Sequence, residues 1–470
     1  MYFCDVGKKR ILRFSPLLLA VMLLAGCVGA TTTPAPAVSP TATVPPAEVT
    51  RIVTREIVVT ATPAPPGPCA PASLRQADQV NIGVLAPLAT SSVLAKGLAL
   101  QAGVSLALEE LQAAGGIDGK PVEAVVYDTG AQPARAAQLA ERLITRDCVI
   151  GIVGGVQDDV AEAIKQVTER YGVPFIVVEA TADSLTEDRP RSLFRIAPAA
   201  TMASRMQTDW LTSVGDFNRD GVITALMIAE NTAAGDAAVA NVERWMPAAG
   251  INLDTLRVDV PAADYSPQIA RIVAMEKVPD AAFLFVGGNA SLELQRQLLD
   301  AGIGPTKGTL LVQGRSALDG PTFWQRLPDG AFTVVGRRGP WQSSLSEIGQ
   351  AFLERYRTAL GQLPESIAFT SHDAVLLLVD AAKRADSLAP ADIVSALEAA
   401  DTPLAGGRYR FPYGTQQPAS NQAFPAYLWH QWPDPPLLYL QYREANQDPA
   451  TIDVIWPLVY RTILDPILRP

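Results

Sequence analysis

The chain has 470 residues, of which 48% are apolar and 18% are charged, so it can bury the cores of two ordinary domains and still leave extra segments. Its 38 Lys and Arg residues stand against 48 Asp and Glu residues, which gives a net charge of −10. Because this balance leaves no basic stripe to neutralise phosphates, the composition argues against a nucleic-acid partner.

Residues 1–27 have the pattern of a signal peptide. Basic residues such as Lys8 and Arg10 precede an apolar run at 17–25 that is too short to span a bilayer. The run ends in Leu24-Ala25-Gly26-Cys27, which resembles the bacterial lipobox, in which the cysteine is lipidated and becomes the new N-terminus. The alternative is an ordinary small-residue cleavage site beside Cys27. We expect a lipid anchor at Cys27 that holds the protein to the membrane from outside the cytoplasm, stably only if it carries more than one acyl chain.

The next segment, residues 28–76, is rich in proline and threonine and poor in large apolar side chains over most of its length. Such a composition cannot form a packed core. We expect a disordered tether, which as an extended polyproline helix would reach on the order of 100 Å.

From residue 80 onward, short β-rich runs alternate with helical patterns, and this alternation is typical of βαβ units with a mostly parallel sheet. The first group of expected strands is 80–85, 121–127, 149–153 and 174–178, with helices at 96–113, 132–145 and 158–171. The second group of strands is 222–228, 255–260, 281–286 and 309–312, with helices at 202–214, 236–248, 267–275 and 291–301. A strand at 332–335 and helices at 345–361, 371–385 and 390–400 follow. We therefore predict an α/β fold with two doubly wound, mostly parallel sheets.

Several local patterns occur in one order along residues 80–432, and together they resemble the type I periplasmic binding proteins of the branched-chain amino acid (leucine/isoleucine/valine-binding) kind. The patterns are Gly97 to Gly103, Leu108-Glu109-Glu110, Ala114 to Val122, Tyr171 to Phe175, Ala180-Thr181-Ala182, Phe194-Arg195 and His372-Asp373-Ala374. The resemblance implies two lobes joined by a three-crossing hinge. The first lobe would comprise 77–197 plus 313–405 and the second 198–312 plus 406–436. Residues 437–470 would form a C-terminal extension whose apolar pattern looks helical.

The same resemblance implies a function. A small polar solute would bind between the carboxyl ends of the two sheets, where open α/β sheets bind ligands, and hinge closure would seal it in. The loaded protein would then dock on the permease of an ABC importer. A tethered sensor that docks on a membrane receptor remains the alternative, because the chain would look the same.

Two cysteines remain in the expected folded region. Cys69 precedes the first strand and Cys148 precedes the third, and those strands are neighbours in the expected topology. In an oxidising compartment we expect the two to pair, the alternative being two separately buried thiols.

Candidate ligand-binding residues follow from matching positions in the family. Relatives hold a ligand carboxylate with hydroxyl and backbone N–H groups at the helix start after the third strand, a sound anion site. Here that turn carries Gln157, Asp158 and Asp159 in place of the expected serine. We expect one of the two aspartates to be the helix N-cap, and their charge weakens the case for an α-amino acid ligand.

Further candidates lie after other strands. Thr181 matches a position whose hydroxyl and backbone contact ligand, and the neighbouring Glu179 either reaches a cationic or hydroxylated ligand or points to solvent. In the second lobe Asn289 either contacts ligand or belongs to a simple glycine turn. The remaining candidates are Ser91, Ser92, Glu230 and Asn231, which would complete a ring of polar groups suited to a small polar solute.

No cofactor or metal is expected. The segment 216–221 resembles the front half of a calcium loop, but Met227 stands where a bidentate carboxylate is required, so a tight Asx turn is the better account. The sequence contains no G-x-S-x-G, H-E-x-x-H or G-x-G-x-x-G motif, and neither His372 nor His430 has a partner at a catalytic spacing. We therefore predict a binding protein, with an α/β enzyme as the less favoured class.

Overall fold

The computed structural model describes residues 67–464 apart from 91, 263, 319 and 416–423. These residues belong to one compact unit, Ala64–Pro470. The expected signal peptide, the expected lipidation site Cys27 and most of the expected tether lie outside the described residues. None of the helices in the described part of the chain has both the length and the apolar content needed to cross a bilayer.

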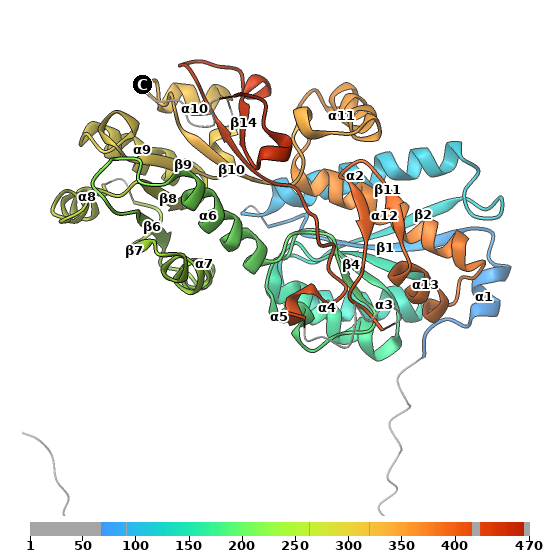
Figure 1. Cartoon of the computed structure of the whole chain (residues 1–470). Helices are drawn as coiled ribbons and strands as arrows, with labels where there is room; N and C mark the ends of the chain where they lie inside the picture. Colours follow the sequence, from blue (N-terminus) through green and yellow to red (C-terminus); the bar gives the residue numbers. More distant parts are fainter. Residues whose placement is uncertain (1–66, 91, 263, 319, 416–423, 465–470) are drawn as a thin grey trace, which may run out of the picture. The chain divides into compact units, whose positions relative to one another are not determined.

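The first lobe is built around a five-stranded parallel sheet with the order β2-β1-β3-β4-β5. Every residue of β3 and β4 is buried, as expected for parallel strands covered on both faces. Helices α2 and α12 pack together on one face, and α3 and α4 pack together on the other (Figure 1). The strands are β1 (Val80–Ala86), β2 (Val122–Asp128), β3 (Val149–Gly154), β4 (Phe175–Val177) and β5 (Leu193–Arg195), and the helices are α2 (Leu94–Ala113), α3 (Pro133–Thr145), α4 (Asp158–Tyr171) and α12 (Ser366–Ala385).

Helices α2 and α12 approach each other closely at Gly103. A Cβ atom at this position would lie 2.3 Å from the carbonyl oxygen of Ala368 and 2.3 Å from Oγ of Ser371. The contact therefore requires glycine, which gives a physical reason for its place in the Gly97 to Gly103 pattern.

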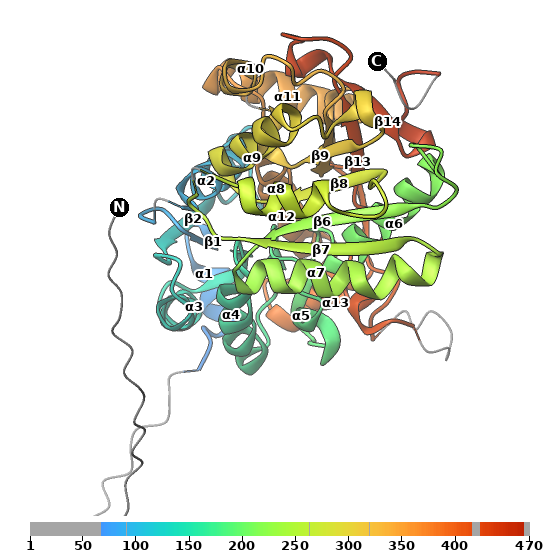
Figure 2. The same ribbon diagram turned by 90° about the vertical axis from the view of Figure 1, so that its left-hand side faces the viewer.

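The second lobe is built around a seven-stranded sheet with the order β14-β13-β10-β9-β8-β6-β7 (Figure 2). Five strands are parallel, and β13 and β14 join them as antiparallel strands at one edge. The strands are β6 (Thr224–Glu230), β7 (Asn252–Val258), β8 (Ala281–Phe285), β9 (Leu310–Gln313), β10 (Val334–Arg338), β13 (Leu437–Gln441) and β14 (Asp453–Trp456). Its helices are α6 (Ala200–Val214), α7 (Ala233–Trp245), α8 (Ser266–Val273), α9 (Gly288–Asp300) and α10 (Gly320–Arg326).

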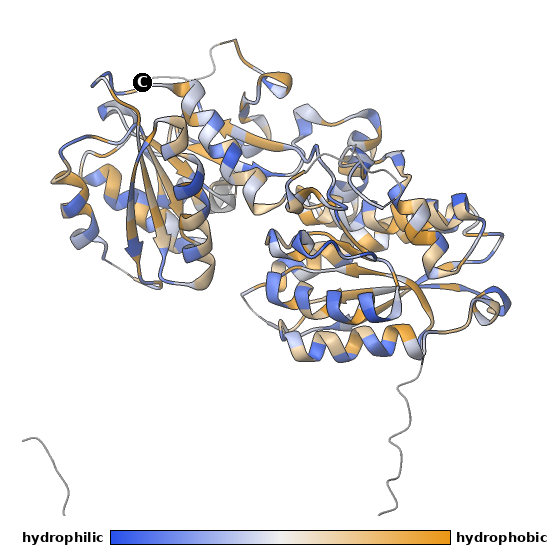
Figure 3. Cartoon of the chain, turned by 60° about the horizontal axis from the view of Figure 1, so that its bottom comes forward, coloured by the Kyte–Doolittle hydropathy of each residue, from blue (hydrophilic) through white to orange (hydrophobic). Residues whose placement is uncertain are grey.

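Each sheet separates two apolar layers. In the second lobe, Trp210 of α6 and Val239 of α7 share a core cluster with β6 and β8, whereas Ile269 of α8 and Leu294 of α9 pack on the opposite face. The strands are predominantly apolar in both lobes, and the helices carry polar residues on their outer sides (Figure 3). This layering confirms the predicted α/β class.

The remaining elements are short or lie outside the two sheets. The helices are α1 (Pro71–Gln76), α5 (Ser184–Glu187), α11 (Glu347–Leu360) and α13 (Pro390–Glu398), and β11 (Asp401–Pro403) pairs with β12 (Arg408–Arg410) in a two-stranded antiparallel sheet. The 3-10 turns are η1 (Pro247–Ala249), η2 (Pro305–Lys307), η3 (Arg315–Leu318), η4 (Gln342–Ser344), η5 (Ala426–Leu428), η6 (Pro449–Thr451) and η7 (Leu458–Tyr460).

The sheet topology differs from the expected lobe boundaries in the middle of the chain. Strand β10 was expected to return to the first lobe, but it pairs in parallel with β9 in the second sheet, with Val334 opposite Val312. Conversely, the segment after residue 405 was expected in the second lobe. Its side chains Tyr409 and Trp432 lie instead in the core cluster of the first sheet, because both are buried aromatic residues that need an apolar layer.

The end of the chain also differs from its expectation. The segment 437–470 was expected to be a helical extension, but it supplies β13 and β14 to the second sheet. Leu438, Tyr439 and Leu440 are all buried, so this run does not alternate between apolar and polar residues. A strand covered on both faces cannot be distinguished from a buried helix by its periodicity.

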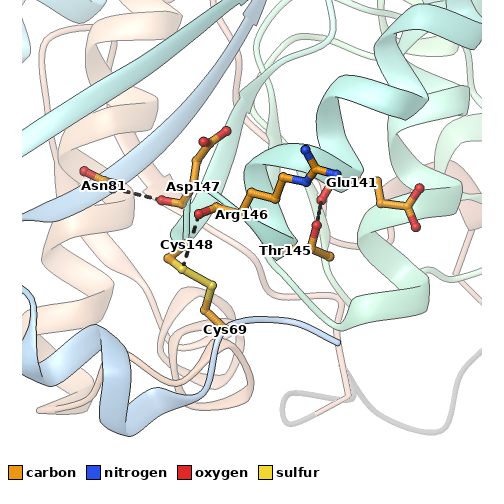
Figure 4. The surroundings of a disulfide bond; sticks show 7 residues. All are labelled: Cys69, Asn81, Glu141, Thr145, Arg146, Asp147 and Cys148. Carbon is orange, nitrogen blue, oxygen red and sulfur yellow. Dashed lines mark hydrogen bonds between the residues drawn. A yellow bond between two sulfur atoms is a disulfide. The ribbon is translucent and has the colours of Figure 1, made fainter. Parts of the chain in front are cut away.

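A disulfide bond joins Cys69 to Cys148, whose Cα atoms are 5.3 Å apart (Figure 4). Beside it, the side-chain amide of Asn81 in β1 donates a hydrogen bond of 2.8 Å to the carbonyl oxygen of Asp147. The expected disordered tether ran to residue 76, but residues 67–76 contain Cys69 and α1. Leu74 of α1 is buried in the core of the first lobe, which accounts for the order of this segment.

Candidate solute-binding site

The chain passes between the two sheets three times, and one pocket lies where the three crossings meet. The crossings are 196–199 after β5, 339–346 after β10 and 433–436 before β13. Residues of all three line the pocket, together with Val178 and Glu179 at the end of β4 and with Ser366 and Thr370 of α12. The pocket is therefore at the carboxyl end of the first sheet, where the topology predicts a ligand site.

Glu179 reaches this pocket but is already engaged in an ion pair. Its Oε1 atom lies 2.5 Å from Nζ of Lys96, in the first turns of α2. The two side chains are 25% and 38% exposed, so solvent screens the pair only in part. The sequence predicts that Glu179 meets either a ligand or solvent. It gives no sign of Lys96 as a partner, because nothing in the sequence places the start of α2 beside the end of β4.

Asp158 is bonded to the strand end that carries Thr181. Its Oδ1 atom accepts the backbone N–H of Thr181 at 2.7 Å and that of Ala182 at 2.9 Å. We expected one of the two aspartates at this turn to be the N-cap of α4, but the N-cap residue is Gln157. The carboxylate of Asp158 instead connects two strand ends, which is a longer-range contact than a cap.

Gln157 begins α4 without a capping hydrogen bond from its side chain. The Oε1 atom of Gln157 is buried and has no hydrogen-bond partner among the described residues. A buried amide oxygen without a donor is costly, so a hydrogen-bond donor at this atom would be stabilising.

The fully buried guanidinium of Arg195 holds the segment after β4 by hydrogen bonds to its backbone. Nη1 of Arg195 donates to the carbonyl oxygens of Ala182 at 2.6 Å and Thr181 at 3.2 Å, and Nη2 donates to that of Tyr427 at 3.1 Å. Burial lowers the pKa of Arg195 to about 10, and the carboxylates of Asp183 and Asp158 oppose this shift. Arg195 therefore stays charged at neutral pH and balances part of the negative charge of Asp183 and Asp158.

The same segment is bonded to the first helix of the second lobe. The carbonyl oxygen of Thr181 accepts the N–H of Ala200 at 2.8 Å. The carboxylate of Asp183 accepts hydrogen bonds from the N–H and the hydroxyl of Thr201 at 3.2 and 2.5 Å. The residues after β4 thus belong to the hydrogen-bond network of both lobes.

The candidates in the second lobe gather at the carboxyl end of its sheet. Oε1 of Glu230 accepts the N–H of Gly287 at 2.6 Å, which ties the end of β6 to the turn after β8. The side-chain amide of Asn231 donates to Oδ1 of Asp259 at 2.5 Å. Asn289 is exposed in the first turn of α9.

The structure thus brings the candidates together as two sets, one at each sheet end. Gln157, Asp158, Glu179 and Thr181 form the set of the first lobe. Ser92 is exposed in the turn before α2, and Ser91 lies outside the described residues.

A buried histidine network supports the pocket wall. The two ring nitrogens of His372 face carboxylates, with Nδ1 at 2.8 Å from Asp373 Oδ1 and Nε2 at 3.0 Å from Glu110 Oε1. Asp373 Oδ2 also accepts hydrogen bonds from the N–H of Gly406 and the hydroxyl of Tyr409, both of which line the pocket. Burial alone lowers the pKa of His372, but Asp373 and Glu110 outweigh it and raise the pKa to about 9.

The second histidine has a similar arrangement. His430 Nε2 lies 2.7 Å from Oε1 of Glu398, Nδ1 lies 3.0 Å from the carbonyl oxygen of Leu193, and the ring stacks on Phe194. Burial raises the pKa of Glu398, but hydrogen bonds from His430 and Thr415 lower it to about 2. Glu110 and Glu398 are thus carboxylate partners that sequence spacing did not reveal, and each histidine ring is buried.

The calcium-like segment folds as a tight turn. The carboxylate of Asp216 accepts the backbone N–H groups of Asp220 and Gly221 at 3.0 and 2.8 Å, and Oδ1 of Asn218 also accepts the N–H of Asp220. The bond to Asn218, which spans two residues, is an Asx-turn contact, whereas those to Asp216 span four and five residues. In the described part of the chain, no group of three or more His, Cys, Asp or Glu side chains is placed to hold a metal ion.

Two sheets with polar carboxyl ends and three connecting crossings define the class of type I periplasmic binding proteins. A family model described as periplasmic binding protein matches residues 79–427, and the chain therefore belongs to that family.

Two curated relatives match most of the chain. Leu/Ile/Val-binding protein homolog 8 of Brucella abortus is 27% identical over 367 residues, which cover 76% of this chain and 88% of the relative. Leu/Ile/Val-binding protein homolog 7 of the same organism is 24% identical over 352 residues, covering 71% and 84%.

Solved structures agree on the fold. The branched-chain amino acid transporter substrate binding protein LivJ from Streptococcus pneumoniae, in complex with isoleucine, is 21% identical with a TM-score of 0.63 and covers 81% of this chain and 100% of its own. A putative branched-chain amino acid ABC transporter from Silicibacter pomeroyi is 20% identical with a TM-score of 0.67 and covers 83% and 99%.

Proposed function

We propose that this protein is an extracytoplasmic, lipid-anchored solute-binding protein of an ABC importer. It captures a small polar solute between the carboxyl ends of its two sheets and delivers the solute to the permease. Family membership supports this assignment, as do the names of its relatives, which refer to Leu, Ile and Val binding or to branched-chain amino acid transport.

The observation that carries the proposal is the pocket lined by all three crossings. A hinge closure changes the backbone angles of a few connecting residues, so the walls of this pocket must change when the lobes move. A solute that contacts those walls can therefore favour the closed form by the difference in its affinity for the two forms. Solute capture and lobe closure are thereby coupled.

The lipid anchor is proposed from the sequence pattern that ends at Cys27. Metabolic labelling with a radioactive fatty acid should mark the full-length protein and should fail to mark Cys27→Ala. Labelling of both variants to the same extent would contradict lipidation at this residue.

Binding is tested on the full-length protein purified in detergent. A ligand at one hundred times its dissociation constant should raise the free energy of unfolding by about 2.7 kcal/mol, which a thermal-shift screen of small polar solutes detects. Small-angle scattering should then show a smaller radius of gyration with the best ligand. Glu179→Gln should weaken binding, because it breaks the Lys96 pair in the pocket wall, whereas Glu187→Gln on the exposed side of α5 should not.

Two results would contradict the proposal. One is chemical conversion of a solute, followed by nuclear magnetic resonance, which would indicate an enzyme. The other is the absence of any solute that both stabilises the protein and reduces its radius.

A further inference from the structure

The backbone N–H groups at the end of β4 form an anion-binding pair that the chain itself fills. The N–H groups of Thr181 and Ala182 converge on one oxygen, Oδ1 of Asp158, at 2.7 and 2.9 Å. Adjacent N–H groups that point at one oxygen are a common way to hold a carboxylate or phosphate. A solute carboxylate that approached this pair would meet Asp158 already bound to it.

The negative charge around this N–H pair also disfavours a solute carboxylate. Asp158 and Asp159 are both exposed at the start of α4, and Glu179 follows two residues before Thr181. Two cations beside this edge are engaged, since Lys96 is paired with Glu179 and the buried Arg195 donates to backbone carbonyl oxygens. A like charge placed at this edge would therefore face repulsion that neither Lys96 nor Arg195 is free to compensate.

The same edge carries two side-chain oxygens that accept hydrogen bonds, one on Asp158 and one on Gln157. Oδ1 of Asp158 carries the two N–H bonds described above. The buried Oε1 atom of Gln157, the N-cap residue of α4, has no partner among the described residues. Acceptors with unused capacity call for donors, so the complementary solute presents N–H groups.

We propose that the solute carries no free carboxylate and meets the first lobe through N–H donors, as a neutral amide or an amine does. This inference rests on the proposed solute-binding function and names its substrate class. Asp158 acts as a specificity-determining residue, because it occupies the donors that a carboxylate would need and repels the carboxylate by its own charge.

Arg338 is the residue that argues most against a solute without a carboxylate. It is exposed at the end of β10 and lines the pocket from the second crossing, so it is a cation that a carboxylate could reach. The experiment therefore includes Arg338→Gln. If the inference holds, this variant keeps the wild-type preference among uncharged solutes.

The test compares solutes with one carbon skeleton and different polar groups: leucine, leucinamide and 3-methylbutylamine, and propionate, propionamide and propylamine. Dissociation constants are measured by calorimetry on the full-length protein. In at least one series, the amide or amine should bind at least about tenfold more tightly than the acid, a difference of about 1.4 kcal/mol.

Variants at position 158 separate the effect of the occupied N–H pair from the effect of the negative charge. Asp158→Ala uncovers the N–H pair, so the ratio of acid to amide affinity should rise by at least about tenfold. Asp158→Asn keeps an acceptor for both N–H groups but removes the charge, so the ratio should rise less. Asp159→Ala makes the same charge change beside the covered pair and is the matched control, with a ratio close to that of the wild type.

The possible outcomes distinguish failure of this inference from failure of the proposed function. Wild-type protein that binds the acids as tightly as the amides overturns the inference but leaves the solute-binding function intact, and loss of that acid binding in Arg338→Gln would identify the residue responsible. An unchanged ratio in a folded Asp158→Ala, or in Asp158→Asn if the alanine variant does not fold, also overturns it. If no solute in the panel binds, the result counts against the proposed function and the inference together.

Discussion

Replacing His372 by Gln is expected to remove most of the pH dependence of stability between pH 6.5 and 9. In the folded protein His372 lies between Asp373 and Glu110, and its pKa rises from 6.5 to about 9. Between these two values the folded state holds a proton that the unfolded state has released. The stabilisation is complete below pH 6.5 and is lost as the pH rises toward 9.

The magnitude follows from the shift. From 6.5 to about 9, at about 1.4 kcal/mol for each pKa unit, the free energy of unfolding should fall by about 3 kcal/mol. His372 is 1% exposed and Asp373 is fully buried, so solvent does little to screen that pair, whereas the Glu110 side chain is 36% exposed and its pair with His372 is partly screened. Glutamine at this position does not titrate, so the His372→Gln variant should be less stable at pH 6.5 and should approach the wild type near pH 9.

Urea denaturation at several pH values between 6 and 9.5 measures the effect, with the difference between wild type and variant isolating His372 from other titrating groups. Glu110→Gln serves as an intermediate, because it leaves His372 with Asp373 alone and should narrow the pH window. A His372→Gln variant whose stability falls with pH as steeply as that of the wild type would refute the reasoning.

Three further changes have outcomes that the structure sets. Arg195→Met should destabilise the protein by about 3 kcal/mol or more in urea denaturation, because it leaves the carbonyl oxygens of Thr181 and Ala182 without their donor and nearby carboxylates without the buried cation; a loss below about 1 kcal/mol would contradict this. Replacing Cys69 and Cys148 by Ser opens a loop with a sequence separation of 79 and should cost at most about 4.5 kcal/mol, seen as a lower melting temperature that reductant no longer affects. Gly103→Ala should cost about 1–3 kcal/mol, because the new Cβ meets α12 at 2.3 Å; unchanged stability would show that the helices separate freely.

The order of strands and helices could be predicted from the sequence because each βαβ unit has a recognisable local pattern. Short apolar runs, helical periodicity and glycine stops such as Gly172, which has a φ of 67°, need no long-range information. Strand β13 escaped prediction for the opposite reason. Its residues are buried on both faces, so the period of two that marks a half-exposed strand is missing.

The candidate site could be predicted only as a set of positions at strand ends. Glu179 and Asp158 stand where the resemblance placed them, but their partners Lys96 and the Thr181 N–H come from other elements. The hydrogen-bond donor that pairs with a carboxylate depends on distances of a few ångströms between separate elements. The local periodicity of a sequence does not contain such distances. The role of Asp158 therefore required the folded chain.

The sulfur bridge between Cys69 and Cys148 has a mechanical consequence. Cys69 lies on the N-terminal side of α1 and β1, and Cys148 lies one residue before β3, which sits between β1 and β4 in the middle of the first sheet. A pulling force on the N-terminal side is passed covalently to this central strand. Helix α1 and the start of β1 bear little of the load, so tension applied on the N-terminal side of Cys69 does not unfold the domain from its first strand.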